Sequence, residues 1–191
     1  MGVHDDAERL RFRNGSEWRA WLADNHATST GVWVLRARAG VEVELISYLD
    51  IVLQALCFGW IDGTVKPMDD ETNGQWCAPR RPTGNWAATN KARVIELEAS
   101  GQMTDAGRRA IEIAKANGSW TVLDGPEAGI EPPEFAEALD AVPAARAAWD
   151  GFPQSVKKFA LAQIAMSKRP ETRAARIAKI VTDAETGKRP L

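Results

Sequence analysis

Residues 47–63 read SYLDIVLQALCFGWIDG, and this stretch decides the fold of the N-terminal part of the chain. Ser47 stands three residues before Asp50, which is the spacing of a helix N-terminal cap. Apolar residues then recur at helical spacing, namely Leu49, Val52, Leu53 and Leu56. Ile51, Ala55 and Phe58 are apolar too, so the helix is hydrophobic nearly all round, and the sequence predicts a centrally buried helix over 47–58 that Gly59 ends.

Short strands are expected on either side of this helix. The β-branched and aromatic run 32–35 predicts a strand covered on both faces. Residues 60–66 predict a second strand with a kink at Gly63, and 75–78 its partner. Between them, 67–74 is an acidic segment rich in turn residues, so we expect a loop there.

Helical patterns dominate the remainder of the sequence. Ser16 is expected to cap a helix that ends near Asn25. After residue 85, caps, prolines and apolar spacing predict helices over 86–100, 104–117, 133–139, 143–149, 155–167 and 171–186.

The predicted fold class is therefore α+β: a small mixed α/β N-terminal part with a short sheet, followed by an all-helical C-terminal part. The expected boundary falls between 1–85 and 86–191. These parts form either one compact domain or two, and residues 79–85 are either a linker or a packed loop.

The overall charge excludes a general attraction to polyanions. There are 24 Lys and Arg against 26 Asp and Glu, a formal net charge of −2. We therefore expect neither nucleic acid nor a membrane as partner, but a small molecule or peptide; the oligomeric state stays open. The first thirteen residues contain no apolar secretory segment, and no stretch approaches the roughly 20 apolar residues of a membrane span. A cytoplasmic location is expected.

Metal and thiol chemistry have little support. Two cysteines, Cys57 and Cys77, are twenty positions apart and the chain has two histidines, so neither a metal nor a cofactor is expected. Cys57 lies on the helix expected to be buried, without a neighbouring His in sequence, which disfavours it as a nucleophile.

Asp62 is the candidate catalytic residue. It follows the buried helix and stands beside Trp60, so its carboxylate could have a raised pKa and act as a general base. The favoured alternative is structural: Asp62 caps the turn at Gly63 or pairs with Arg80.

A binding surface rich in Trp and Arg is expected between Tyr48 and Asn90. Arg80 and Arg81 precede a helix N-terminus, an arrangement that favours an anion; alternatively they pair with the acidic residues 69–71. Eight Trp suit an aromatic or cationic ligand, although most should be core. The candidate ligand-binding residues are Tyr48, Gln54, Trp60, Lys66, Trp76, Arg80, Arg81, Trp86 and Asn90.

The last helix carries Arg169, Arg173 and Arg176 on one face. This face suits either nucleic acid or pairing between helices. Because Glu171, Asp183 and Glu185 are interspersed, the second interpretation is favoured.

Several blocks resemble the YdeI/OmpD-associated, or bacteriocin-protection, family, and the resemblance extends from Trp18 to Ile180. They are Ser47–Tyr48, Ala55–Gly63, Pro79–Arg81, Asn85–Trp86, Asn90 and Lys168–Arg173. The resemblance implies a role in envelope stress and peptide resistance, and it supplies no catalytic residues. Gln54, Ala78 and Ala87 stand where the family typically has Glu, Thr and Ser, which implies a changed ligand or binding without turnover.

Three functional hypotheses follow. The preferred one is a small-molecule or peptide binding protein with a Trp-lined, Arg-anchored pocket that serves resistance. The alternative is an enzyme for a small anionic or aromatic substrate, with Asp62 as general base and Arg80 as anion clamp. The third is a helical interaction module that uses the C-terminal basic face.

Overall fold

The computed structural model describes residues 4–190, which form two compact units. Unit 1 comprises the residues up to 84 together with 89–117, and unit 2 comprises 85–88 together with the residues from 118 on. The α+β class is confirmed: unit 1 contains a four-stranded sheet and unit 2 is helical. The units divide elsewhere than at residue 85, because two helices that follow this position belong to unit 1.

Unit 1 is built on a sheet of four strands in the order β1-β2-β4-β3. The outer strand β1 runs parallel to β2, and the other pairs are antiparallel. All residues from Val32 to Leu35 are buried, so the strand predicted to be covered on both faces is confirmed. The strands are β1 (Arg9–Arg11), β2 (Val32–Ala37), β3 (Trp60–Pro67) and β4 (Thr72–Pro79).

The hairpin between β3 and β4 is tighter than expected. Residues 67–74 were expected to form one loop, but β4 already begins at Thr72. The reason is local: a carboxylate oxygen of Asp69 accepts hydrogen bonds from the backbone N–H groups of Glu71 and Thr72, at 2.9 and 2.7 Å. The predicted kink at Gly63 is present as a register shift between Asp62 and Val65.

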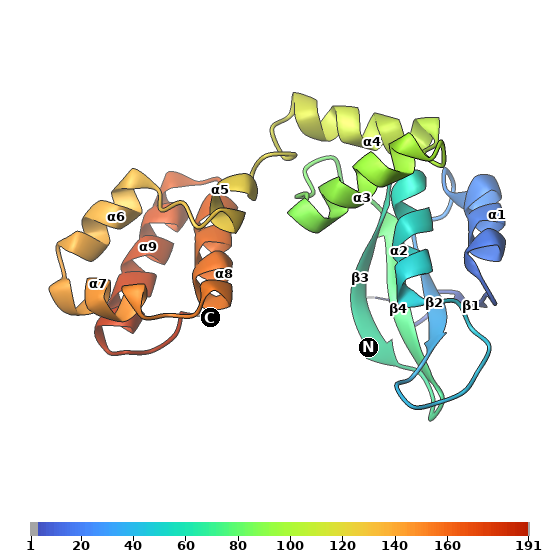
Figure 1. The fold of residues 1–191 in the computed structure, drawn as a ribbon, viewed down its shortest axis with the longest axis horizontal. Coiled ribbons are helices and arrows are strands. Elements are labelled where there is room, and N and C mark those ends of the chain that lie inside the picture. The colour runs from blue at the N-terminus through green and yellow to red at the C-terminus, as the bar shows by residue number, and fades with distance from the viewer. Residues whose placement is uncertain (1–3, 191) are drawn as a thin grey trace. The chain divides into compact units, whose positions relative to one another are not determined.

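Helix α2 (Tyr48–Cys57) begins at Ser47, whose hydroxyl accepts the N–H of Asp50 as predicted. The expectation that it is buried all round is wrong. Val52 and Leu56 are buried, whereas Leu49 is 51% exposed. The helix lies against one face of the sheet, so its outer side stays open despite its apolar composition (Figure 1).

Three further helices belong to unit 1: α1 (Gly15–Asn25), α3 (Ala88–Ala99) and α4 (Asp105–Ala116). The cap of α1 is Asn14, which accepts the N–H of Glu17; Ser16 lies inside the helix instead. Thr104 caps α4 as predicted, and its hydroxyl also donates to the carbonyl of Cys57 at 2.5 Å. This bond ties the start of α4 to the end of α2.

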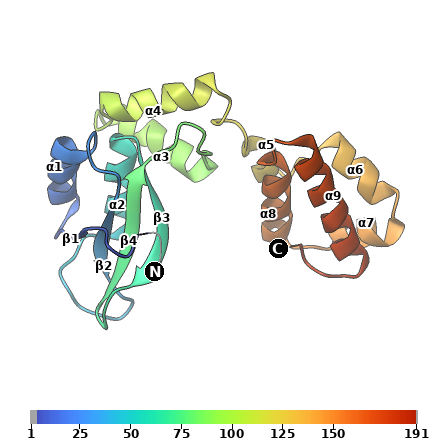
Figure 2. The ribbon, with the colours of Figure 1, turned by 180° about the vertical axis from the view of Figure 1, so that it is seen from behind.

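The opposite face of the sheet carries aromatic side chains. Figure 2 shows this face, over which no helix that the structure describes in unit 1 runs. Trp33 and Trp76 are opposite one another in the β2–β4 register and their rings meet edge to face at 5.3 Å. His4 stacks on Trp76 with ring centroids 3.9 Å apart. The face is thus partly covered by an N-terminal segment.

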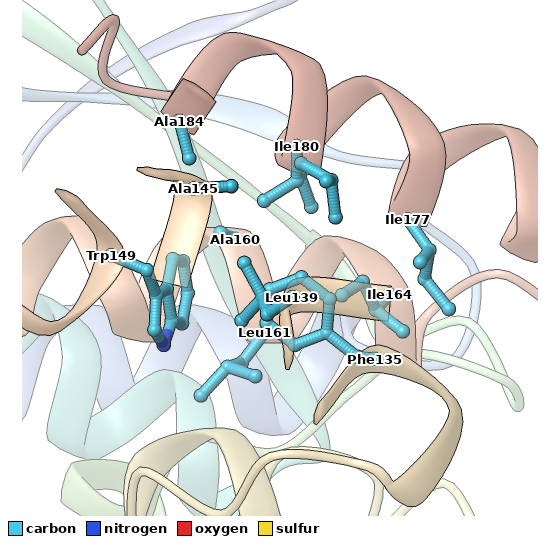
Figure 3. Close-up of a cluster of buried hydrophobic side chains, with 11 residues drawn as sticks. Phe135, Leu139, Ala145, Trp149, Ala160, Leu161, Ile164, Ile177, Ile180 and Ala184 are labelled. Carbon is cyan, nitrogen blue, oxygen red and sulfur yellow. The ribbon is translucent and has the colours of Figure 1, made fainter. Parts of the chain in front are cut away.

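Unit 2 buries its own apolar cluster, drawn in Figure 3, around Trp149, Leu139 and Leu161. Pro133, Pro143 and Pro170 each stand at the start of a helix, where the missing N–H costs least. A one-turn helix, α5, was not expected. The helices are α5 (Asp124–Glu127), α6 (Pro133–Asp140), α7 (Pro143–Asp150), α8 (Gln154–Ala165) and α9 (Pro170–Glu185).

The basic face of α9 is engaged within unit 2. The guanidinium of Arg173 donates to the carbonyl of Ile164 at 2.9 Å and pairs with Glu134 at 2.5 Å. Arg176 donates to the carbonyl of Gln163 at 2.6 Å. Both carbonyls belong to the last turn of α8, where a helix lacks internal donors and its dipole favours a cation. Pairing between helices therefore accounts for two of the three arginines.

No helix in the described part of the chain is long and apolar enough to cross a membrane.

Candidate functional site

A cleft of about 370 Å³ opens on the aromatic face of the sheet in unit 1. The beginning of β3 and the end of β4 form this cleft, together with the segment that follows β4. Its lining includes Trp76 and Ala78 of β4, Ile61 and Gly63 of β3, and Arg80 and Arg81. None of the described residues that line it is a carboxylate, so the local charge of the cleft is positive.

The two arginines differ in their surroundings. Arg80 is mostly buried, and this burial lowers its pKa to about 10, while the negative charge of Asp62 acts in the opposite direction. Arg81 is exposed, and its guanidinium has no hydrogen bond or ion pair within the part of the chain that the structure describes. Arg80 can therefore position an anion with little side-chain motion, and Arg81 can reach it from the rim.

The alternative raised from the sequence is wrong: Arg80 and Arg81 do not pair with the acidic residues 69–71. Strand β4 runs between the two groups, and its eight residues separate them by roughly 23 Å. Asp69 lies 3.8 Å from Arg11 instead.

Asp62 lies on the other face of the sheet from Trp76. It pairs with Cys77 in the β3–β4 register, and alternate residues of a strand point to opposite faces. Its carboxylate accepts a 2.8 Å hydrogen bond from the hydroxyl of Tyr48 on α2. Burial and then this carboxylate raise the pKa of Tyr48. Asp62 and Tyr48 are thus brought together, outside the cleft.

Asn90 lies near this polar pair but also outside the cleft. Its side-chain oxygen accepts a 3.0 Å hydrogen bond from Arg93, whose charge acts on Tyr48 and opposes the rise of the phenol pKa. The guanidinium of Arg36 lies 5.8 Å from the centroid of the Tyr48 ring, within cation–π range.

Four other candidate residues have structural contacts elsewhere. Gln54 accepts a 2.9 Å hydrogen bond from Arg19. Trp60 is 1% exposed and packs edge-on against Trp18 and Trp21 in the core of unit 1. Lys66 forms an ion pair with Asp5. Trp86 is buried in unit 2 against Trp120.

Two cleft residues lie outside the surface expected between Tyr48 and Asn90. His4 stacks on Trp76, and Thr30 precedes β2 at the cleft wall. Neither has a local motif that could have indicated it, because strand order alone brings residues 4 and 30 beside residue 76.

Both cysteines are buried, and their thiols are poorly suited to act as nucleophiles. Burial raises the pKa of both thiols; Arg19 opposes the rise at Cys57. Within residues 4–190, no three His, Cys, Asp or Glu side chains form a group that could hold a metal ion.

Comparisons with known proteins match the two parts of the chain separately. Residues 10–110 match a family model described as Domain of unknown function (DUF8412). Residues 129–187 match the model described as Bacteriocin-protection, YdeI or OmpD-Associated. No curated protein and no solved structure matches the chain.

The resemblance drawn from the sequence is confirmed over 129–187, which includes Lys168–Arg173. The match to that family model does not reach Trp18: the Cys57–Asp62 block and Arg80 lie within residues 10–110, which match the other model. The chain therefore belongs to the DUF8412 family, whose model covers more than half of its residues, while residues 129–187 match the bacteriocin-protection, YdeI or OmpD-associated model.

Proposed function

We propose that unit 1 binds a small molecule in which an aromatic or apolar part is joined to an anionic group. One observation carries the proposal: Trp76, Arg80 and Arg81 line one cleft that contains no carboxylate among its described residues. Trp76 offers an apolar face, and guanidinium groups form charge-assisted hydrogen bonds with carboxylates and phosphates. Small-molecule sites are commonly concave and apolar, with a few convergent polar groups.

Binding is favoured over turnover because the candidate base is not in the cleft. Asp62 projects from the other face of β3 and accepts the hydroxyl of Tyr48. The enzyme alternative rests on the electrostatic interaction between Asp62 and Arg80. The enzyme alternative predicts that Asp62→Asn abolishes the turnover of a ligand that binding experiments have identified, while the affinity of the protein for this ligand is retained.

A role in resistance to antimicrobial peptides, exercised in the cytoplasm, is part of the same proposal. The match of 129–187 to the bacteriocin-protection family supports it. A strain that lacks the gene should become more sensitive to a bacteriocin, and Arg81→Gln should fail to restore protection if the cleft is needed. Equal sensitivity of the two strains would refute this role.

The binding proposal is tested by calorimetric titration of the full chain with indole-3-acetate, indole and acetate. Indole-3-acetate should bind most tightly, because it contacts both Trp76 and the arginines. Arg81→Gln should weaken it by about tenfold, the size expected for one charge-assisted hydrogen bond.

Arg9→Gln is the matched control. Arg9 is also an exposed arginine of unit 1 without a side-chain partner among the described residues, and it lies outside the cleft. Its substitution makes the same change in net charge and should leave the affinity unchanged. Equal weakening by both variants, or no saturable binding of indole-3-acetate, would refute the proposed site.

A further inference from the structure

A second cleft, of about 270 Å³, shares Arg80 and Arg81 with the first. It lies where Gly59, at the end of α2, meets α4, and it is also lined by Phe58, Arg109 and Ile113. Because the same two arginines line both clefts, a ligand anchored on them in the first cleft can extend into the second.

The second cleft is also positive. No described residue in its lining is a carboxylate. Arg109 is exposed, and its guanidinium makes no hydrogen bond or ion pair with any described residue. Its neighbour Arg108 differs, since it pairs with Glu98 at 2.9 Å and with Asp105 at 3.1 Å. Arg108 thus has a structural role on α4, whereas Arg109 is available to a ligand.

We infer that the ligand of unit 1 is an aromatic molecule that carries more than one phosphate group. This inference rests on the proposed function and names its ligand class. The aromatic part lies against Trp76, the first phosphate lies between Arg80 and Arg81, and the next phosphate reaches Arg109. Guanidinium groups bind phosphate oxygens through paired hydrogen bonds, and three of them along two adjoining clefts exceed what a single carboxylate can occupy.

Negative charge beside the first cleft sets the orientation of the ligand in it. A neighbouring hollow is lined by Trp76 and by three acidic residues, Asp6, Glu8 and Asp5, the last of which pairs with Lys66. These carboxylates repel phosphate, and so they favour a pose in which the phosphates point toward the arginines.

The test is calorimetric titration of the full chain with adenosine, AMP and ADP, at constant ionic strength and with EDTA present. ADP should bind about tenfold more tightly than AMP, because its second phosphate gains one charge-assisted contact. Arg109→Gln should remove this advantage and leave the affinity for AMP unchanged. Arg9→Gln, the control of equal charge change, should preserve the advantage of ADP.

Three results would overturn the inference: equal affinities for AMP and ADP, an ADP advantage that persists in Arg109→Gln, or no binding of either nucleotide. In each case, saturable binding of indole-3-acetate that depends on Arg81 would leave the proposed function standing. Loss of that binding as well would refute the proposed function itself.

Discussion

Gly59 is the position at which a single methyl group should disturb both the fold and the second cleft. It follows the end of α2 with a φ of +72°, a left-handed conformation that side chains other than glycine adopt at a cost. A Cβ at this position would lie 3.0 Å from the carbonyl oxygen of Ala106 and 3.0 Å from the Cβ of Ala110. Both neighbours belong to α4, so Gly59→Ala should push α4 outward.

The size of the effect follows from two contributions. The left-handed conformation costs an Ala about 1–2 kcal/mol, and loss of glycine's freedom in the unfolded chain returns about 0.4–1 kcal/mol. Overpacking against α4 adds about 1–2 kcal/mol, at the lower end of the range for an inserted methyl group. Gly59→Ala should therefore destabilise unit 1 by about 2–3 kcal/mol.

Gly101→Ala separates these contributions. Gly101 belongs to the same unit and has a φ of +70°, but nothing lies within 4 Å of its added Cβ. Its cost should therefore be that of the conformation alone, about 1 kcal/mol. Hydrogen exchange read by mass spectrometry on peptides from α2 and α4 measures the opening free energy of unit 1 apart from unit 2. A Gly59→Ala cost no larger than that of Gly101→Ala would refute the close packing of α4 on Gly59.

Three further outcomes are expected. Trp149→Phe removes the 2.7 Å hydrogen bond from the indole N–H to Glu131 and should cost unit 2 about 2 kcal/mol in urea denaturation; a cost below about 0.5 kcal/mol would contradict a bond to a charged acceptor. Tyr48 is the single tyrosine, so ultraviolet titration reports its phenol alone. The pKa of this phenol should lie above 10, and Asp62→Asn should lower it. A phenol pKa that does not respond to Asp62→Asn would contradict the hydrogen bond. The pKa of Glu134 is lowered by its own backbone N–H and by Arg173. The ionised Glu134 therefore stabilises the folded state above pH 4.5, and this stabilisation is lost as pH falls through the folded-state pKa. Arg173→Met should raise the pKa of Glu134 in an NMR titration, and an unchanged value would contradict the pairing.

Much of the local structure was predictable from short-range signals. Ser47 and Thr104 cap their helices as expected, because a cap needs only a side-chain oxygen and an N–H group three residues on. The kink at Gly63 and the strand over 32–35 were also predictable, from a glycine within a strand pattern and from a run of residues with high β-propensity. Strand β1 was not, because three residues with two exposed arginines carry no strand pattern of their own.

The candidate site was predictable only in part. Trp76, Arg80 and Arg81 were chosen from the sequence, and the structure places them in one cleft. Trp60 and Trp86 were chosen for the same chemical reason but are buried in the cores of units 1 and 2. Residue type could not separate these cases, because a Trp contributes equally well to a core and to a binding surface.

The sequence by itself determined where helices such as α2 and α4 begin, since their capping signals act over three or four residues. Only the tertiary structure decided that Asp62 and Trp76 project from opposite faces of the sheet, because a shift of one residue in strand register would exchange the faces. It also decided that β4 keeps Arg80 and Arg81 away from the acidic turn and that Arg109 of α4 lines a cleft with them. These relations depend on the pairing of strands and on the packing of helices far apart in the chain, which no local pattern of residues specifies.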